Sequence, residues 1–222
     1  MRVEVKSGGR AERTPKGGET RAAILAAAES VFARTGLEGA RTEAIASAAG
    51  VNKAMLYYYF RSKDLLYAAV LENHMKEFHR RAMEVLAASG SPGAAVLRFV
   101  ETHFDYISGH PDYPRLFQYM LMTDAGRGGR MIRKYLAPVS RRLIEVMDLG
   151  QRRREMRRFD SHQASISLVA LNVFYFAASP VMRIVTGMDP YSAQSLKHRR
   201  EEVLAFVRHG LFRKPEAVRV SC

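Results

Sequence analysis

The segment from Gly36 to Leu66, which reads GLEGARTEAIASAAGVNKAMLYYYFRSKDLL, decides the fold of this chain. A short helical pattern over about residues 43–49 is followed by Gly50, which can adopt the positive φ of a tight turn at little cost. Asn52 then supplies a favourable N-cap for a second helix, which ends near Phe60. The segment therefore predicts two short helices joined by a tight turn.

The second of these helices is rich in polar aromatic side chains. Lys53, Tyr57, Tyr58 and Tyr59 lie within seven residues, a composition poorly suited to a buried core. Tyrosine hydroxyls and lysine ammonium groups donate hydrogen bonds to phosphate oxygens and so fix a protein on a duplex. We therefore predict a helix-turn-helix whose second helix enters the major groove of DNA, rather than an ordinary surface helix.

Helical periodicity extends through most of the rest of the chain. Apolar residues recur at 3.6-residue spacing, and the alternating runs typical of strands are not found. We predict an all-α fold of about nine helices, three in a small N-terminal unit and about six behind it. The predicted helices cover approximately residues 20–35, 43–49, 53–60, 62–88, 94–108, 114–123, 131–151, 161–182 and 190–209. The glycine cluster at 126–129 is predicted to separate two of them.

The basic excess of the chain lies mostly outside the opening segment. The formal net charge of +13 favours a polyanionic partner. Residues 1–21 hold six Lys or Arg against three acids, residues 22–78 six against six, and residues 79–222 the remaining 23 against 13. The net charge of the chain therefore supports nucleic-acid binding only weakly. The prediction of DNA binding rests on the helix-turn-helix motif.

The N-terminal residues and the single cysteine indicate the cellular compartment in which the protein is expected. Residues 1–19 lack the apolar stretch of a secretory signal and are predicted to form a disordered basic arm. Cys222 stands alone, which excludes an intrachain disulfide and fits a reducing compartment. We therefore expect a cytoplasmic protein.

Residues 161–182 contain no Asp, Glu, Lys or Arg, so their length and composition are compatible with a bilayer span. We favour a soluble helix with no membrane contact, because the stretch contains several polar residues and no second such segment exists. One side of it would face its own domain and the other a partner subunit. A second apolar stripe on the last helix completes a predicted four-helix dimer interface. The interface residues are predicted to be Val169, Val173, Leu196, Val203, Leu204 and Val207.

The chain resembles the TetR family of transcriptional regulators. The resemblance is carried by Ile24-Leu25-Ala26-Ala27-Ala28 with Phe32 and Gly36, by Ile45-Ala46 with Ala49-Gly50-Val51, and by Leu56-Tyr57-Tyr58-Tyr59-Phe60 with Lys63 and Leu65. It covers about residues 20–66 well. The resemblance implies a DNA-binding domain over 20–66, a ligand-binding and dimerisation domain over 67–222, and a homodimer that binds a palindromic operator. It also implies that a small-molecule effector in the second domain releases the DNA.

The resemblance also implies roles for individual residues. Ala54 and Met55 stand where the family faces bases, and Tyr57, Tyr58 and Lys63 stand where it commonly touches phosphates. The predicted DNA-binding residues are Arg41, Thr42, Asn52, Lys53, Ala54, Met55, Tyr57, Tyr58 and Lys63.

The sequence departs from the family pattern in three places, of which Leu37 in place of the usual aromatic residue is a mild change of volume. Ala40-Arg41 replaces the usual Thr-Thr, so either Thr42 caps the first short helix or Arg41 itself meets a phosphate. Met55 replaces a common Thr, and base preference therefore cannot be inherited from relatives.

The effector is predicted less sharply than the DNA contacts. Phe104, Phe117, Met120, Asn172 and Phe176 are the candidates for a ligand pocket, although aromatic and Met residues at helical spacing are more often plain core. From Arg127 to Arg158 there are 11 Lys or Arg and three acids. This run is either a solvated face or a docking site for an anionic effector such as an acyl-coenzyme A.

No catalytic signature is found in the sequence. The seven histidines do not form a metal-ligand set, and neither a nucleophile triad nor a phosphate-binding loop is present. We expect a protein that is not an enzyme and uses no metal and no cofactor. The rival hypotheses are an all-helical carrier or enzyme for an acyl ligand, and a DNA-coating protein without sequence preference.

Overall fold

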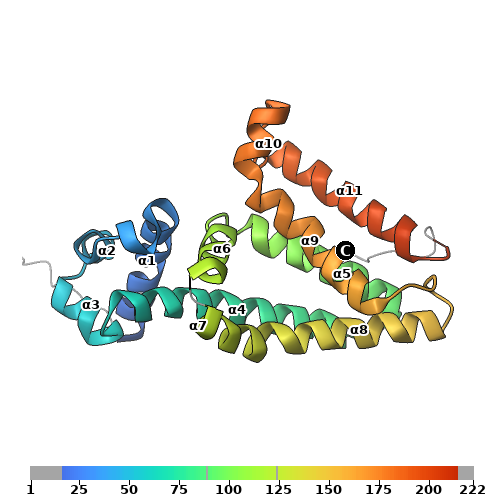
Figure 1. Ribbon diagram of the computed structural model, residues 1–222, viewed down its shortest axis with the longest axis horizontal. Coiled ribbons are helices and arrows are strands. Elements are labelled where there is room, and N and C mark those ends of the chain that lie inside the picture. Colours follow the sequence, from blue (N-terminus) through green and yellow to red (C-terminus); the bar gives the residue numbers. More distant parts are fainter. Residues whose placement is uncertain (1–16, 89, 124, 215–222) are drawn as a thin grey trace, which may run out of the picture.

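The computed structural model describes residues 17–88, 90–123 and 125–214. These residues form eleven α-helices and one π-helical segment (Figure 1). In chain order they are α1 (Gly17–Gly39), α2 (Thr42–Ala48), α3 (Lys53–Phe60), α4 (Lys63–Ala87), α5 (Pro92–Ser108), α6 (Tyr113–Thr123), α7 (Ala125–Met131), η1 (Ile132–Leu136), α8 (Ala137–Arg152), α9 (Ser161–Ala177), α10 (Ser179–Thr186) and α11 (Ala193–Leu211). An isolated β-bridge between Met156 and Phe212 is the sole extended pairing among them. The predicted all-α fold is confirmed.

Helices α1, α2 and α3 form a small head at one end of the molecule (Figure 1). Ile24, Phe32, Ile45, Leu56 and Phe60 are buried together between them. These apolar side chains come from all three helices, and their removal from water holds such short helices in place.

Gly36 and Gly50 redirect the chain inside the head. Their φ values are +70° and +67°, in the region that a side chain with a Cβ rarely adopts. Gly36 kinks α1 near its end, and Gly50 makes the turn between α2 and α3. The predicted tight turn at Gly50 is confirmed.

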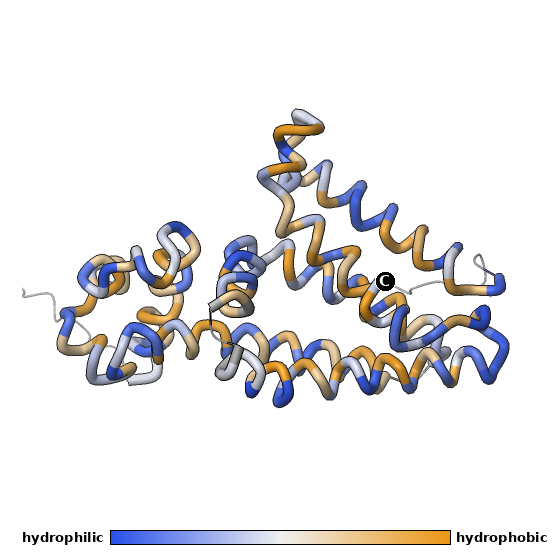
Figure 2. Tube along the Cα trace, viewed as in Figure 1, coloured by the Kyte–Doolittle hydropathy of each residue, from blue (hydrophilic) through white to orange (hydrophobic). Residues whose placement is uncertain are grey.

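Helix α4 runs from the head into a larger helical body (Figure 1). It packs against α1 in the head and against α5 and α8 in the body, and α9 and α11 pack on α5 in turn. Apolar residues follow the inward faces of these helices (Figure 2). Because α4 is continuous from Lys63 to Ala87, the predicted domain boundary at residue 66 falls inside its first turn.

Polar contacts tie the head to the body along α4. The hydroxyl of Tyr67 donates to the carbonyl of Leu116 on α6 at 2.6 Å. The hydroxyl of Tyr106 on α5 donates to the carbonyl of His74 at 3.0 Å. The Nε2 atom of His74 lies 2.9 Å from the carboxylate of Glu29 on α1, within ion-pair distance when the imidazole is protonated. The joint therefore combines α1, α4, α5 and α6.

Three predicted helix boundaries need correction. The predicted 161–182 helix is two helices, α9 and α10, which meet at a bend of 68° beside Pro180. The predicted break at glycines 126–129 is instead the helix α7. The last helix begins at Ala193 with Ser192 as its N-cap, three residues later than expected.

Among the described residues, no single helix is long and apolar enough to cross a membrane. Of the described helices, only the bent pair α9 and α10, when the two helices are counted together, has the length and apolar composition of a membrane span. Of the predicted disordered arm, residues 1–16 lie outside the described residues, and the prediction is wrong for residues 17–19, which begin α1.

Candidate functional site

The turn between α2 and α3 presents the start of α3 to solvent. The side chain of Asn52 accepts a hydrogen bond from the backbone N–H of Met55 at 2.8 Å and so caps α3 as predicted. The backbone N–H of Val51 donates to the carbonyl of Ala46 at 2.9 Å and closes the turn. The first residues of α3 are therefore held in one orientation by local hydrogen bonds.

Helix α3 is divided into a buried and an exposed face. Leu56 and Phe60 are buried in the head, as their spacing predicts. Tyr57 and Tyr58 keep 40% and 78% of their surface exposed. Tyr59 is partly buried against the head core and stacks edge-on with Tyr58 at 5.2 Å between ring centroids. The structure thus leaves the hydroxyls of Tyr57 and Tyr58 available for a partner.

Lys53 and Glu43 connect the exposed surfaces of α3 and α2. The ammonium of Lys53 forms a salt bridge with the carboxylate of Glu43, and both side chains are at least half exposed. This hydrogen bond raises the pKa of Lys53 and lowers that of Glu43. An exposed pair of this kind contributes little to stability. Lys53 can therefore exchange Glu43 for a phosphate at low cost.

The start of α2 resolves an alternative left by the sequence. Thr42 is the first residue of α2 and is buried, so it is not the N-cap. Arg41 occupies the cap position with extended backbone and makes no capping hydrogen bond through its side chain. Of the two alternatives, capping by Thr42 is wrong. Arg41 is exposed, and its phosphate contact stays a prediction. At the start of α3, Ala54 is exposed and Met55 is half-buried, and their base contacts also stay predictions.

Lys63 contacts the backbone of the head. Its ammonium donates to the carbonyls of Glu38 and Ala40, each at 3.2 Å. Two of its three N–H donors therefore connect the start of α4 to the chain between α1 and α2. Lys63 therefore stabilises the head, and its phosphate contact stays a prediction for the remaining donor.

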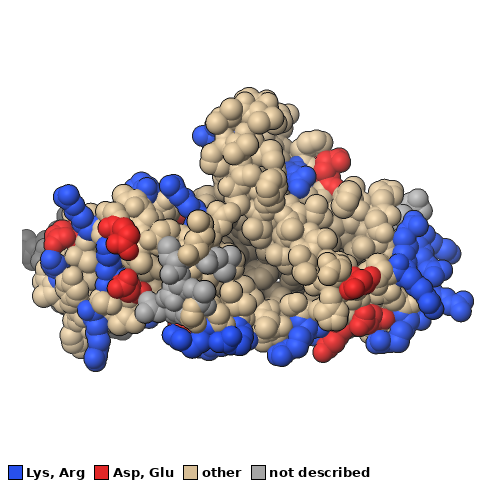
Figure 3. Space-filling model, in the orientation of Figure 1, with Lys and Arg blue, Asp and Glu red and all other residues tan. Residues whose placement is uncertain are grey.

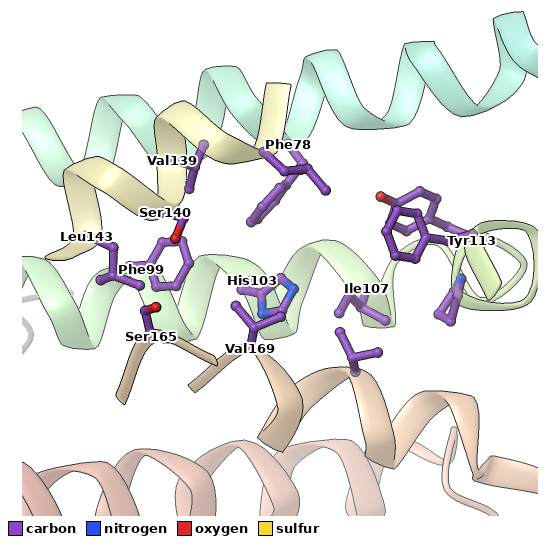
Figure 4. Close-up of a pocket in the computed structure, with 14 residues that line it drawn as sticks. Phe78, Phe99, His103, Ile107, Tyr113, Val139, Ser140, Leu143, Ser165 and Val169 are labelled. Atoms are coloured by element: carbon purple, nitrogen blue, oxygen red, sulfur yellow. The ribbon is translucent and has the colours of Figure 1, made fainter. Parts of the chain in front are cut away.

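The body contains an apolar cavity enclosed by α4, α5, α6, η1, α8 and α9. Its volume is about 170 Å³, and a hollow in this region of the surface is visible in Figure 3. Figure 4 shows the aromatic rings of Phe78, Phe99 and Tyr113 around it. The lining residues are Phe78, Phe99, His103, Ile107, Tyr113, Pro114, Phe117, Leu136, Val139, Ser140, Leu143, Ser165, Val169 and Val173. None of them is Asp, Glu, Lys or Arg.

One of the five predicted ligand residues, Phe117, lines this cavity. Phe104 and Phe176 pack together in a separate buried cluster, with ring centroids 5.1 Å apart. Met120 is buried against Gly128, and Asn172 is buried behind the cavity wall. We therefore correct the assignment of these four residues as cavity lining.

His103 is a polar cavity residue that was not predicted from the sequence, as are Ser140 and Ser165. It follows Phe99 and precedes Ile107 at intervals of four residues, which places all three on one face of α5. The amide nitrogen of Asn172 donates to the carbonyl of Val100 at 3.0 Å and lies 3.3 Å from Nδ1 of His103. Burial lowers the pKa of His103 from 6.5 to about 4, so its imidazole is neutral at neutral pH.

The predicted dimer interface also changes. Val203, Leu204 and Val207 are buried inside the protomer, and Leu196 packs beside its Phe104 cluster. Val169 and Val173 line the cavity. Val203, Leu204 and Val207 were predicted wrongly because the apolar stripe of α11 faces its own α5 and α9. Val169 is exposed and Val173 and Leu196 are partly buried, so their place in an interface stays a prediction. The exposed large apolar side chains of this region are Ile166, Val169, Phe174, Val181, Ile184, Val185, Met188 and Phe206.

The basic run ends far from the head. Arg152, Arg153, Arg154, Arg157 and Arg158 are exposed at and beyond the end of α8. Figure 3 shows this group at the end of the molecule opposite to the head. A dense positive patch therefore exists, but it is not part of the α3 surface.

Comparison with known proteins agrees with this two-part architecture. Residues 24–70 match the family model described as Bacterial regulatory proteins, tetR family. Residues 92–207, which are half of the chain, match the model described as Tetracyclin repressor-like, C-terminal domain.

Two curated relatives match about half of the chain. The HTH-type transcriptional repressor NicS of Pseudomonas putida is 35% identical over 108 residues, 49% of this chain and 50% of NicS. The HTH-type transcriptional regulator RutR of Escherichia coli is 34% identical over 103 residues, 46% of this chain and 48% of RutR. The matched stretch spans about half the length of these relatives.

Solved structures share the fold over most of the chain. The ketosteroid transcriptional regulator KstR2 of Mycobacterium tuberculosis has a TM-score of 0.71 and 16% identity, over 87% of this chain and 95% of its own. The transcriptional regulator FadR of Bacillus subtilis in complex with stearoyl-CoA has a TM-score of 0.66 and 19% identity, over 84% and 96%. With family models matching both the head and the body, the chain belongs to the TetR family of bacterial transcriptional regulators.

Proposed function

We propose that this protein is a repressor that binds a palindromic operator as a homodimer and releases it when a small apolar effector occupies the body. The observation that carries the proposal is the exposed face of α3, which presents Tyr57 and Tyr58 beside Lys53. Phenolic hydroxyls and an ammonium group are donors for phosphate oxygens. Ala54 at the exposed start of α3 is small enough to let the helix approach base edges, including a thymine methyl.

The cavity supports the effector part of the proposal. It is enclosed by helices of the body, and its wall includes Tyr113 and Phe117 of α6, a helix that also packs against α1 of the head. A ligand that prefers one arrangement of these helices shifts the population of head positions. A shift of the heads changes their spacing on DNA, and therefore the affinity for two half-sites one helical turn apart.

The exposed apolar side chains of α9, α10 and α11 support the homodimer. Ile184 on α10 is 84% exposed, and α10 projects from the body (Figure 1). Large apolar side chains exposed on neighbouring helices are typical of a protein interface. We therefore place the dimer contact on α10 and on the outward sides of α9 and α11.

The proposal is tested by fluorescence anisotropy with DNA that flanks the protein's own gene and with a random duplex of equal length. We expect preference for the flanking DNA, steep salt dependence, and a loss of about three- to tenfold for Tyr57→Phe on both duplexes. Tyr175→Phe, which removes a hydroxyl bonded to the carbonyl of Pro190 in the body, is the matched control and should bind normally. Equal affinity for both duplexes would indicate a sequence-blind DNA-coating protein, and no affinity for either would favour the carrier or enzyme hypothesis.

A further inference from the structure

The cavity in the body restricts the size of its ligand. Its volume of about 170 Å³ is close to the roughly 150 Å³ of engineered cavities that bind benzene. Drug-sized ligands occupy about 300–1,000 Å³. The space therefore fits a single ring with a short substituent and is too small for a long acyl chain.

The lining of the cavity restricts the charge of the ligand. None of the lining residues is acidic or basic, and four of them are the aromatic residues Phe78, Phe99, Tyr113 and Phe117. An ion in this environment would lose its hydration without gaining a counter-charge. Arg141 and Arg142 of the basic run stand between Ser140 and Leu143 in sequence, but neither lines the cavity, and Arg142 forms a salt bridge with Glu145. The arginine cluster at the end of α8 begins at Arg152, nine residues beyond Leu143, or about 13 Å along the helix.

The hydrogen-bond pattern fixes the tautomer of His103. Asn172 is fully buried, and its amide nitrogen is identified by its contact with the carbonyl of Val100. The same nitrogen faces Nδ1 of His103, which must therefore accept, so that the proton of the neutral ring is on Nε2. Among the described residues no acceptor for this Nε2–H is found, and Figure 4 shows the ring in the cavity wall between Phe99 and Ile107. A donor in a cavity wall that has no acceptor in the protein can bond to an acceptor of a ligand.

We propose that the effector is a compact, uncharged, mainly apolar molecule of about one ring, and that its hydrogen-bond acceptor receives the Nε2–H of His103. The proposal rests on the proposed function in taking this cavity as the effector site. The aromatic rings supply apolar contact, and His103 selects molecules with an oxygen or nitrogen acceptor over hydrocarbons of equal size. Asn172 acts as a positioning residue, because it holds the imidazole in the donating tautomer.

The test is isothermal titration calorimetry of the purified protein, without DNA, against four probes of similar size. These are acetophenone, ethylbenzene, benzoate and phenyltrimethylammonium. We expect acetophenone to bind most tightly, ethylbenzene about three- to tenfold more weakly, and the two ions not measurably. Equal affinity for ethylbenzene, tighter binding of either ion, or no binding of acetophenone would each overturn the proposal.

Two variants test whether His103 causes the preference for acetophenone. His103→Phe should abolish the preference for acetophenone over ethylbenzene, whereas His162→Phe, at an exposed position on α9, should retain it. If His103→Phe does not fold, nitrogen NMR of the wild-type protein gives the same answer. Acetophenone should shift the Nε2 resonance of His103, and an unchanged resonance at saturation contradicts the proposal. Because DNA is absent, loss of operator binding alone would refute the proposed function and leave this inference standing.

Discussion

Lys53 and Lys63 have similar side chains in the same small head, yet their surroundings separate their roles. Lys53 meets an exposed carboxylate, whereas Lys63 donates to two backbone carbonyls. The caps Asn52 and Ser62 could be predicted because each accepts from a backbone N–H three residues away. The contacts of Lys63 could not be predicted in this way, because its partners Glu38 and Ala40 are 25 and 23 residues away in sequence.

We expect Lys63→Ala to destabilise the head by about 1–3 kcal/mol, because two backbone carbonyls lose a charged donor. Thermal unfolding followed by circular dichroism measures this effect. Lys53→Ala is the matched control and should leave the unfolding temperature unchanged while weakening DNA binding and reducing its salt dependence. Equal unfolding temperatures for the two variants would contradict the structural role of Lys63.

His103 should make the protein sensitive to acid. Its pKa is about 4 in the folded state, below the ordinary value of 6.5. As the pH falls through 6.5 the unfolded chain takes up a proton here that the folded protein does not, so stability is lost between pH 6.5 and 4. We expect this residue to account for about 2 kcal/mol of the stability lost between pH 7 and 5.

Urea unfolding of the wild type and of His103→Phe at pH 7, 6 and 5 measures that contribution. The unfolding free energy of the variant should change less with pH than that of the wild type. Parallel pH profiles would show that His103 is not held neutral by burial.

At the scale of helices, the helical periodicity of a segment could be predicted from its own residues. Which neighbour its apolar face packs against could not. The apolar stripe of α11 is the same whether it packs on α5 and α9 of its own chain or on a partner. Val203, Leu204 and Val207 were misassigned for this reason. The glycines of α7 were predicted as a break because glycine disfavours isolated helices, although packing against α6 and η1 overrides that preference.

Helix α10 should be a main contact of the dimer. Ile184→Asp places a charge on its most exposed apolar position and should raise the dimer dissociation constant at least about tenfold. Sedimentation velocity over a range of protein concentrations measures this change. Met122→Asp, at an 86% exposed position on α6, is the control and should leave association unaffected. A wild-type protein that is monomeric at all concentrations would contradict the assignment.

At the scale of the whole molecule, the two-part organisation could be predicted and the cavity could not. The helix-turn-helix is contained in about thirty consecutive residues, so its motifs are visible in the sequence. The cavity is formed by residues from Phe78 to Val173, and its shape depends on the packing of six helical segments. The chain's densest cluster of arginines lies at the end opposite to the head (Figure 3), so net charge is a poor guide to the DNA surface.

The central claim is that two α3 helices of one dimer bind two half-sites of an operator. Hydroxyl-radical footprinting of the DNA that flanks the protein's own gene tests it most directly. We predict two symmetric protected regions whose centres are about 34–36 Å apart, one turn of DNA. Both regions should disappear together when the dimer is disrupted by Ile184→Asp. A single protected region without symmetry, or uniform protection of the whole duplex, would contradict this account.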